Sequence, residues 1–312
     1  MLLVPVWAVV LALVAVAVAH LVAFDRTRVF LLADSYTLWI YLPAYAIAVT
    51  AACFRSRSLA LVAGLLVVAQ LAWVLPPVFQ TDSVPASARS APRLRVLTAN
   101  VNFENHDHPP IIGEITRDNA DVVMLEEATP LWWLAIQSSD LLKTYTYHVR
   151  VPRWDPGAMV LLSKLPLTDV RVRKAGGWPI ITATIVVGGE AVHIVEVHLV
   201  APLDTFGQNQ QAQQAITRFV RDTPKPRLVA GDFNASPYNR WFGQIEGLGL
   251  REASDALGQS FTTTWPNGEH FLPPLRLDHV FTDPQLIPLD ASIGTGKGSD
   301  HRPLLVDIAV TR

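Results

Sequence analysis

The sequence contains very little cysteine and no excess of basic residues. Cys53 is the single cysteine among 312 residues, so an intrachain disulfide is excluded and cysteine usage does not indicate the redox compartment. From residue 83 onward, 21 Lys and Arg stand against 24 Asp and Glu. Proteins that hold duplex nucleic acid usually carry a basic stripe, because phosphate contacts supply most of their non-specific affinity. This part of the chain therefore lacks the charge pattern of a duplex-binding protein.

The first apolar run lacks both charge and a basic start. Residues 1–24 carry no charged side chain and would span roughly 36 Å as a helix at about 1.5 Å per residue, which is enough to cross a bilayer. A cleaved signal peptide is the alternative, but two further apolar runs follow at 36–54 and 59–79. The sequence therefore predicts a multi-pass protein of the cell membrane, with a three-helix anchor in residues 1–80.

Charge does not decide how these helices are oriented. One short loop carries Arg26 and Arg28, and the other carries Arg55 and Arg57. Because the positive-inside rule counts Lys and Arg near the ends of the spans, the two sides are equal. The side of the membrane on which the rest of the chain lies is left open by this count.

A polar stretch with serine, alanine and proline separates the apolar part from the rest of the chain. Residues 81–92 are predicted to form a short linker, and residues 93–312 are numerous enough for one large core. Hydrophobic spacing and turn residues predict strands at 94–99, 121–125, 145–149, 158–162, 167–172, 180–187, 191–199, 228–232, 277–282 and 304–310, and helices at 110–119, from 129, at 205–221 and at 240–248. Strands and helices mix without strict βαβ alternation, which favours an α/β (α+β) four-layer sandwich of two packed mixed sheets flanked by helices.

The sequence LVAGDFN at residues 228–234 is the most informative stretch of this domain. An apolar strand runs into Gly231, where the backbone can turn or a ligand can approach closely. Asp232 and Asn234 are two residues apart, so at a strand end a carboxylate and an amide point the same way. A glycine–aspartate pair after a strand is also an ordinary turn, so the other strand ends decide between the two interpretations.

Polar and metal-binding residue types stand at the ends of the other predicted strands too. Taken singly, each has a structural explanation as a turn residue, a helix cap or a buried histidine. Their occurrence together is difficult to explain by turn chemistry. The set comprises Asn100, Glu127, His198, Asp232, Asn234, Asp278, Asp300 and His301.

These segments resemble the endonuclease/exonuclease/phosphatase superfamily, which has the deoxyribonuclease I-like fold. The matching motifs are LTANV, MLEEA, GAMVLLSKLPL, VHL, GDFN, RLDHVF and SDHRPL, and they cover nearly all of residues 94–312. With its apolar anchor, the chain is similar to a bacterial membrane branch that includes proteins associated with teicoplanin resistance. The resemblance implies a metal-dependent phosphoric ester hydrolase.

The resemblance also implies a role for each motif residue. Glu127 would be the main metal ligand, with Asn100 and Asp300 close by, and carboxylate and amide oxygens suit Mg²⁺ or Mn²⁺. Asp232 would orient or deprotonate the attacking water, and Asn234 would hold that water and a phosphate oxygen. His301, oriented by Asp278, would stabilise charge on the phosphoryl group. His198 would lie toward the leaving group.

Some residues depart from the family pattern or remain outside it. Glu126 precedes Glu127, and strand alternation lets only one of them face the metal. Glu196 stands where the family commonly has Asn, and it is expected either to pair with His198 or to face solvent. The His106 to His108 stretch is open to three interpretations, a solvated turn, a substrate contact or a metal cluster.

Together these features predict a membrane-anchored, divalent-metal-dependent phosphoesterase. A bilayer anchor raises the effective concentration of lipid-linked or small phosphate esters, and envelope precursors are the substrates that the resemblance implies. This favours an extracytoplasmic catalytic domain with the amino terminus in the cytoplasm. The alternatives are a surface nuclease acting on DNA or RNA and a non-catalytic membrane-bound binding module.

Overall fold

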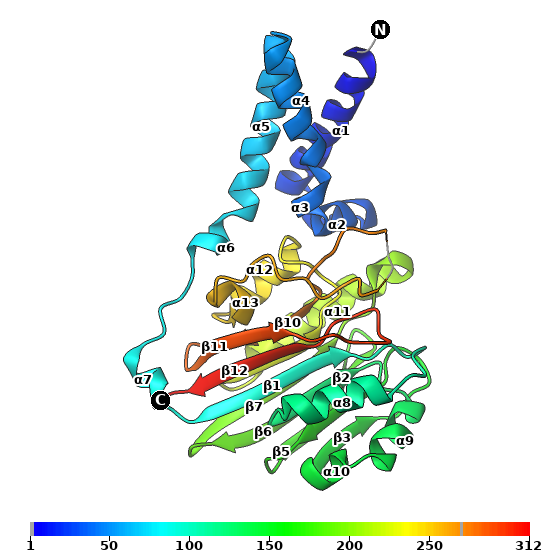
Figure 1. The fold of residues 1–312 in the computed structure, drawn as a ribbon, viewed down its shortest axis with the longest axis vertical. Coiled ribbons are helices and arrows are strands. Elements are labelled where there is room, and N and C mark those ends of the chain that lie inside the picture. The colour runs from blue at the N-terminus through cyan, green and yellow to red at the C-terminus, as the bar shows by residue number, and fades with distance from the viewer. Residues whose placement is uncertain (1–2, 269–270) are drawn as a thin grey trace. The chain divides into compact units, whose positions relative to one another are not determined.

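A computed structural model describes residues 3–268 and 271–312. The chain forms two compact units (Figure 1). The helical unit comprises residues 1–80 together with 235–243, and the sandwich unit comprises residues 81–234 and 244–312. Residues 1–80 coincide with the predicted anchor. The inclusion of residues 235–243 was not expected from the sequence.

The helical unit is built from apolar helices. They are α1 (Leu3–Val22), the 3₁₀ turn η1 (Phe24–Arg26), α2 (Arg28–Ser35), α3 (Thr37–Ile40), α4 (Leu42–Cys53), α5 (Arg57–Val74) and α6 (Pro76–Phe79). Two helices, Val4–Val22 and Arg57–Val74, are long and apolar enough to cross a membrane. The middle segment qualifies only if α2 and residues 37–53 form a single span, and these are bent by 74°.

Polar side chains occupy the bend of that middle segment. Ser35 Oγ donates to Leu31 O at 2.9 Å, and Thr37 Oγ1 donates to Asp34 O at 2.8 Å. Hydroxyl groups that bond to the backbone of the preceding turn compete with the helical pattern and bend helices. The bend therefore lies at the start of the predicted run at 36–54, which contains α3 and α4.

Residues 235–243 belong to the helical unit through buried hydrogen bonds. Asn239 is 2% exposed, and its Oδ1 accepts a hydrogen bond from Ser35 Oγ at 2.9 Å. Asn239 Nδ2 donates to Leu31 O at 3.0 Å, and Arg240 N donates to Asp25 Oδ2 at 2.6 Å. These contacts fix the segment against the residues that follow α1.

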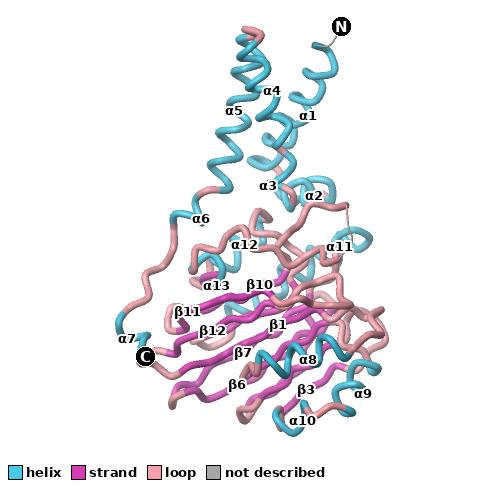
Figure 2. Tube along the Cα trace, viewed as in Figure 1, coloured by secondary structure: helices cyan, strands magenta, loops and turns pink. Residues whose placement is uncertain are grey.

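The sandwich unit contains two six-stranded sheets, coloured by secondary structure in Figure 2. The first has the order β11 (Leu286–Ile293), β12 (Leu304–Val310), β1 (Arg93–Asn100), β2 (Val122–Glu126), β4 (Met159–Ser163) and β3 (Tyr147–Val151). The second has the order β5 (Thr168–Ala175), β6 (Trp178–Val187), β7 (Glu190–His198), β8 (Arg227–Asp232), β10 (Asp278–Thr282) and β9 (Arg251–Glu252). Each sheet has one parallel pair, β1 with β2 and β7 with β8. Both sheets are therefore mixed.

The helices that follow residue 80 belong to the sandwich unit, apart from the first residues of α12, which belong to the helical unit. They are α7 (Ala86–Arg89), α8 (Pro109–Asp118), α9 (Pro130–Ser138), α10 (Leu141–Thr144), α11 (Pro202–Asp222), α12 (Arg240–Glu246) and α13 (Ala253–Ala256). Leu94 and Val96 join the core between the sheets, whereas Leu97 packs with Ile115 and Trp132 of the helices on the outer face. This alternation buries both faces of β1. The predicted four-layer sandwich of two mixed sheets flanked by helices is confirmed.

Two strand connections depend on particular residues, a glycine pair between β6 and β7 and a proline within β11. The connection of β6 to β7 is a hairpin with Gly188 and Gly189 at φ +60° and +90°, as the two glycines indicated. β11 was missed because Pro288 lies within it and the register shifts between Pro288 and Asp290, so the expected alternation is broken.

Candidate active site

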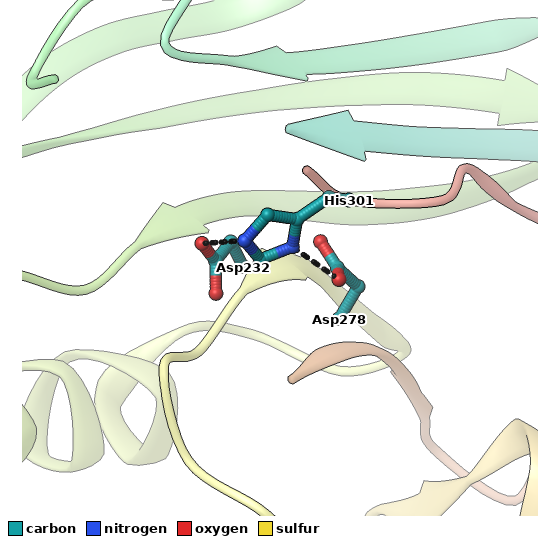
Figure 3. A group of neighbouring side chains, drawn as sticks. All are labelled: Asp232, Asp278 and His301. Atoms are coloured by element: carbon teal, nitrogen blue, oxygen red, sulfur yellow. Dashed lines mark hydrogen bonds and ion pairs between the residues drawn. The ribbon is translucent and has the colours of Figure 1, made fainter. Parts of the chain in front are cut away.

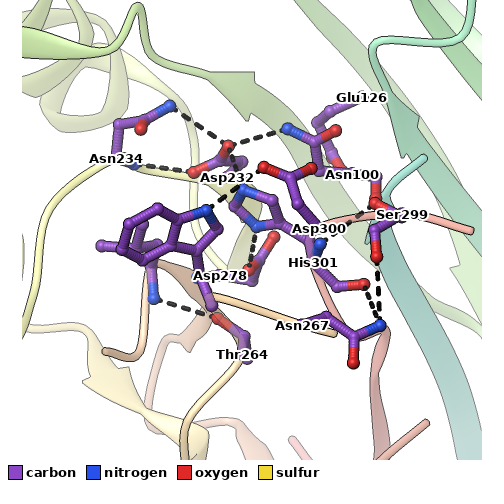
Figure 4. A network of polar contacts seen from close by, with 12 residues as sticks. Asn100, Glu126, Asp232, Asn234, Thr264, Asn267, Asp278, Ser299, Asp300 and His301 are labelled. Atoms are coloured by element: carbon purple, nitrogen blue, oxygen red, sulfur yellow. Dashed lines mark hydrogen bonds and ion pairs between the residues drawn. The ribbon is translucent and has the colours of Figure 1, made fainter. Parts of the chain in front are cut away.

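The predicted site residues meet at one edge of the sandwich because of the strand directions. β1, β2, β7 and β8 end there, and the antiparallel β10 begins there. Asp232 lies opposite both His198 and Asp278 in the sheet register. Asp300 and His301 come from the loop before β12, which starts at the same edge because β12 is antiparallel to β1. Figure 4 shows Asn100, Asp232, Asp278, Asp300 and His301 converging at this edge.

Asp232 is the centre of the polar network. Its side chain is fully buried, and Oδ2 accepts hydrogen bonds from Asn100 Nδ2 at 2.9 Å and from Asn234 Nδ2 at 3.1 Å. Its other oxygen accepts from Asn234 N at 2.8 Å. Burial raises the pKa of Asp232, against the opposing effect of the nearby histidines. A carboxylate with a raised pKa is a stronger proton acceptor.

His301 lies between two carboxylates (Figure 3). Its Nδ1 is 2.8 Å from Asp278 Oδ2, and its Nε2 is 3.7 Å from Asp232 Oδ2. Burial alone would lower the pKa of His301, but the charges of Asp278 and Asp232 outweigh it and raise the pKa to about 10. At neutral pH the ring is therefore an imidazolium, which can donate a hydrogen bond from each nitrogen.

The backbone takes unusual conformations at three positions of the site. Gly231 has φ +140°, and a Cβ there would lie 1.8 Å from Val197 O, so the close approach of β7 requires glycine. Glu127 and Asn234 have φ +61° and +44°, in the left-handed region that costs free energy for residues with a side chain. Backbone strain of this kind is typical of functional sites.

The predicted set of Glu127, Asn100 and Asp300 offers two carboxylates at this edge, while the amide oxygen of Asn100 accepts a hydrogen bond from Asn102 N at 3.0 Å. Asn100 Nδ2 is 3.0 Å from Glu127 Oε1, and Asn102 Nδ2 is 2.8 Å from Asp300 Oδ1. Carboxylates outnumber cationic groups here, and hard oxygen ligands are those that Mg²⁺ and Mn²⁺ prefer. By the chemistry of its donors, the set fits the divalent cation that the family resemblance implies.

A second arrangement has the geometry of a metal site. Ligand atoms of Asp232, Asp278 and His301 all lie within 4.8 Å of one another. A protonated imidazole has no lone pair to offer a metal, and Asp278 holds one of its nitrogens. This group therefore offers a buried ion-paired histidine together with two carboxylates.

The two glutamates that departed from the family pattern are both inside the protein. Glu126 is fully buried and accepts a hydrogen bond from Thr98 Oγ1 at 3.1 Å, and burial raises its pKa well above the ordinary value. Glu196 is also fully buried, so the expectation that it faces solvent is wrong. Burial raises the pKa of both carboxyl groups, and for Glu126 the charge of Glu196 raises it further.

Two other histidines, His279 and His108, pack against side chains outside this polar network. His279 is buried on the other face of β10, with its Nδ1 3.8 Å from Glu252 Oε1 and its ring against Phe233. His108 stacks edge-on against Trp132, with 4.4 Å between the ring centroids. His198 Nε2, by contrast, is 3.7 Å from Glu127 Oε1 and 3.6 Å from Asp232 Oδ2.

The sequence did not single out Asn102, Thr264, Trp265, Asn267 or Ser299, which complete the network. Ser299 Oγ donates to Asn100 O at 2.7 Å, and Trp265 Nε1 donates to Asp300 Oδ2 at 3.2 Å. The sequence TWPN at 264–267 could have indicated some of them, because it combines turn residues with a tryptophan shortly before the RLDH strand.

Known proteins resemble this chain in sequence and in fold. A profile of the Endonuclease/Exonuclease/phosphatase family matches residues 97–301. A search of curated proteins finds no match. Among solved structures, TDP2 from D. rerio complexed with single strand DNA product is 15% identical with a TM-score of 0.61, over 70% of this chain and 99% of that one.

Two bacterial structures are similar to about the same extent. The 3'-5' exonuclease NExo from Neisseria meningitidis is 20% identical with a TM-score of 0.56, over 69% of this chain and 100% of that one. An endonuclease/exonuclease/phosphatase from Beutenbergia cavernae is 19% identical with a TM-score of 0.54, over 70% of this chain and 72% of that one. The shared part is the sandwich fold.

Proposed function

The chain belongs to the Endonuclease/Exonuclease/phosphatase family, whose enzymes are metal-dependent hydrolases of phosphoric esters, and from that premise we propose that it hydrolyses a phosphate ester at the edge where Asp232 and His301 meet. The observation that carries the proposal is the His301 ring held between the carboxylates of Asp278 and Asp232, which raise its pKa to about 10. It places a fixed positive charge beside a buried carboxylate. Such a pair can stabilise a phosphoryl group while accepting a proton from water.

The roles of the residues follow from their contacts. Asp232 accepts the proton of the attacking water, and Asn234, bonded to both oxygens of Asp232, holds that water in place. His301 donates from Nε2 to a phosphoryl oxygen, and Asp278 keeps its ring charged and oriented. His198, on the other side of Asp232, is positioned to donate to the leaving oxygen.

Glu127, Asn100 and Asp300 are the residues that would hold a divalent cation. When bound, Mg²⁺ or Mn²⁺ neutralises charge on the phosphate and on the leaving oxygen. Asn100 donates to both Glu127 and Asp232, so one amide fixes the distance between the metal-binding carboxylate and the base.

A small or lipid-linked phosphate ester is the substrate class that we propose. The acidic balance after residue 83 gives little affinity for the many phosphates of a duplex. The apolar helices are compatible with attachment to a membrane, where lipid-linked esters are concentrated. A nuclease is the second candidate, because similar structures contain DNA, as a single-strand product with TDP2 and a product hairpin with NExo.

A phosphate-release screen with the full chain in detergent and Mg²⁺ tests this choice. Lipid pyrophosphates and phospholipids are compared with single-stranded and duplex DNA at equal phosphate concentration. We expect the highest kcat/KM on a lipid phosphate ester. Higher kcat/KM on DNA would contradict the substrate class and favour the nuclease, and no hydrolysis of any ester would contradict the enzyme itself.

His301 and His279 are expected to differ strongly when replaced by alanine. His301→Ala removes the imidazolium beside Asp232 and should lower kcat by about 100-fold or more, as loss of a transition-state donor does. His279→Ala is the matched control, because this ring is buried on the opposite face of β10. It should lower the thermal midpoint while changing kcat of the folded protein by less than about threefold. Equal losses of kcat would contradict our assignment of the strand faces.

We propose that the sandwich unit lies outside the cytoplasm, where envelope lipids carry exposed phosphate groups. This requires three spans, with the bent segment at 28–53 acting as one of them. A reporter that fluoresces only in the cytoplasm, fused after Arg312, is therefore expected to be dark. The same reporter fused before Met1 should be bright. A bright carboxyl-terminal fusion would place the active site inside and remove the envelope substrates.

A further inference from the structure

The segment 264–267, Thr-Trp-Pro-Asn, forms hydrogen bonds to the backbone of Asp278 and Asp300 and to the backbone N that follows His301. It precedes β10 and the loop that carries Asp300 and His301, and Thr264 and Asn267 are labelled in Figure 4. None of its side chains is bonded to Asp232 in the network of that figure. Its contacts instead fix the partners of Asp232.

Thr264 ties together the two residues of the His301–Asp278 pair. Its side chain is 0% exposed, and Oγ1 accepts hydrogen bonds from the backbone N of Leu277 at 3.0 Å and of Asp278 at 3.1 Å. Its carbonyl oxygen accepts from Arg302 N at 2.8 Å, directly after His301. One residue therefore holds the main chain at Asp278 and beside His301.

Asn267 closes the loop that presents Asp300. Its backbone N donates to Asp300 O at 2.7 Å. Its Nδ2 lies 2.9 to 3.1 Å from the carbonyl oxygens of Thr295, Gly296 and Ser299. Carbonyl groups of an irregular loop need donors from outside a regular ladder, and here one amide group provides them. Trp265 adds a bond from Nε1 to Asp300 Oδ2 at 3.2 Å.

We propose that residues 264–267 are a positioning element for the hydrolytic site, with two separable parts. Thr264 sets the alignment of His301 with Asp278, and Asn267 with Trp265 sets the position of Asp300 toward the cation. The proposal rests on the proposed phosphoesterase function for its kinetic readout. Its structural readouts, the His301 ring signals and the affinity for metal, do not depend on any substrate.

Thr264→Val is the central test, because valine keeps the shape of threonine and removes the acceptor. In the full chain, with bis-p-nitrophenyl phosphate and Mg²⁺, we expect kcat to fall by about 30- to 100-fold with KM within about threefold, since small misplacements of catalytic groups cost this much. The ¹⁵N signals of His301 should shift as its bond to Asp278 lengthens. Thr264→Ser restores the hydroxyl and should restore kcat to within about threefold.

Thr263→Val is the matched control, since it makes the same change at the neighbouring, partly exposed position. It should leave both kcat and the His301 signals unchanged. Thr264→Val with normal kcat and normal His301 signals would overturn the proposal. Equal losses of kcat in Thr264→Ser and Thr264→Val would also overturn it, because the hydroxyl would then not be the cause.

Asn267→Ala tests the second part through metal affinity. We expect Mn²⁺ affinity, measured by electron paramagnetic resonance without substrate, to fall by about 10- to 100-fold, as it does when groups that orient metal ligands are removed. Thr264→Val should bind Mn²⁺ normally. Unchanged Mn²⁺ affinity in Asn267→Ala would overturn the assignment of this residue. If the wild type hydrolyses no ester but these shifts are found, the function fails while the positioning element stands.

Discussion

Asp232→Asn is expected to lower kcat by about 1,000-fold while KM changes by less than about threefold. General-base catalysis contributes about 100- to 10,000-fold, and asparagine cannot accept the proton of water. The expected loss corresponds to about 4 kcal/mol of transition-state stabilisation. Asparagine has nearly the same shape, so binding of the substrate should persist and the loss should appear in kcat. Steady-state kinetics on a p-nitrophenyl ester with saturating Mg²⁺ measures both constants.

Asp140→Asn supplies the control for this experiment. The Asp140 carboxylate is 85% exposed and pairs with Lys143 at 2.7 Å, so its removal should affect neither constant. Thermal unfolding of each variant confirms that it is folded at the assay temperature. A kcat within tenfold of the wild type for Asp232→Asn would show that another group accepts the proton.

Glu127→Gln should abolish metal-dependent hydrolysis, whereas Glu126→Gln should leave most of it. The Glu127 side chain is 15% exposed and lies beside Asn100, so amidation removes a ligand charge at the proposed cation site. Loss of a group that only orients a metal ligand already costs about 10- to 100-fold in affinity, and loss of the ligand itself should cost at least as much. Glu126 is fully buried with its Oε1 bonded to Thr98 Oγ1, burial raises its pKa well above the ordinary value, and glutamine keeps its shape, so this change should disturb the cation site least.

Calorimetric titration of each variant with Mg²⁺ distinguishes the role of Glu127 from that of Glu126. Activity of the wild type in excess chelator tests the need for metal. We expect weakened binding only in Glu127→Gln, with both variants retaining the cooperative unfolding of the wild type. Full activity of the wild type in excess chelator would remove the metal from the mechanism. A larger loss of Mg²⁺ affinity in Glu126→Gln would exchange the roles of the two glutamates.

Much of the site was accessible from the sequence because its residues end strands. Asn100, His198 and Asp232 each follow an apolar run, and strand direction alone brings such ends to a shared edge. The motif residues could therefore be named before their distances were known. Their partners could not, because contacts such as Thr264 to Asp278 join segments whose relation depends on the whole sandwich.

The misses have physical causes in particular residues. Pro288 interrupts the alternation of β11, so this edge strand was not predicted, and the polar segment at 28–35 that precedes the second apolar run was not predicted to be a helix. Alternation placed Glu196 on the His198 face of β7 but did not reveal that the first sheet covers it, with Leu125 and Glu126 of β2 beside it. In each case a local pattern was correct and the surrounding packing decided the outcome.

The hydrogen bonds of Asn239 have a practical consequence for anyone who expresses the sandwich unit alone. A fragment beginning at residue 81 would lack Ser35 and Leu31, which bond to a buried amide only five residues after Asn234. Each lost hydrogen bond removes about 0.5–1.5 kcal/mol of net stabilisation, so the loop after Asn234 would be exposed to water and would rearrange or fray. Weak turnover by such a fragment would then report the missing helices, and the full chain in detergent or lipid is the appropriate reference state for its kinetics.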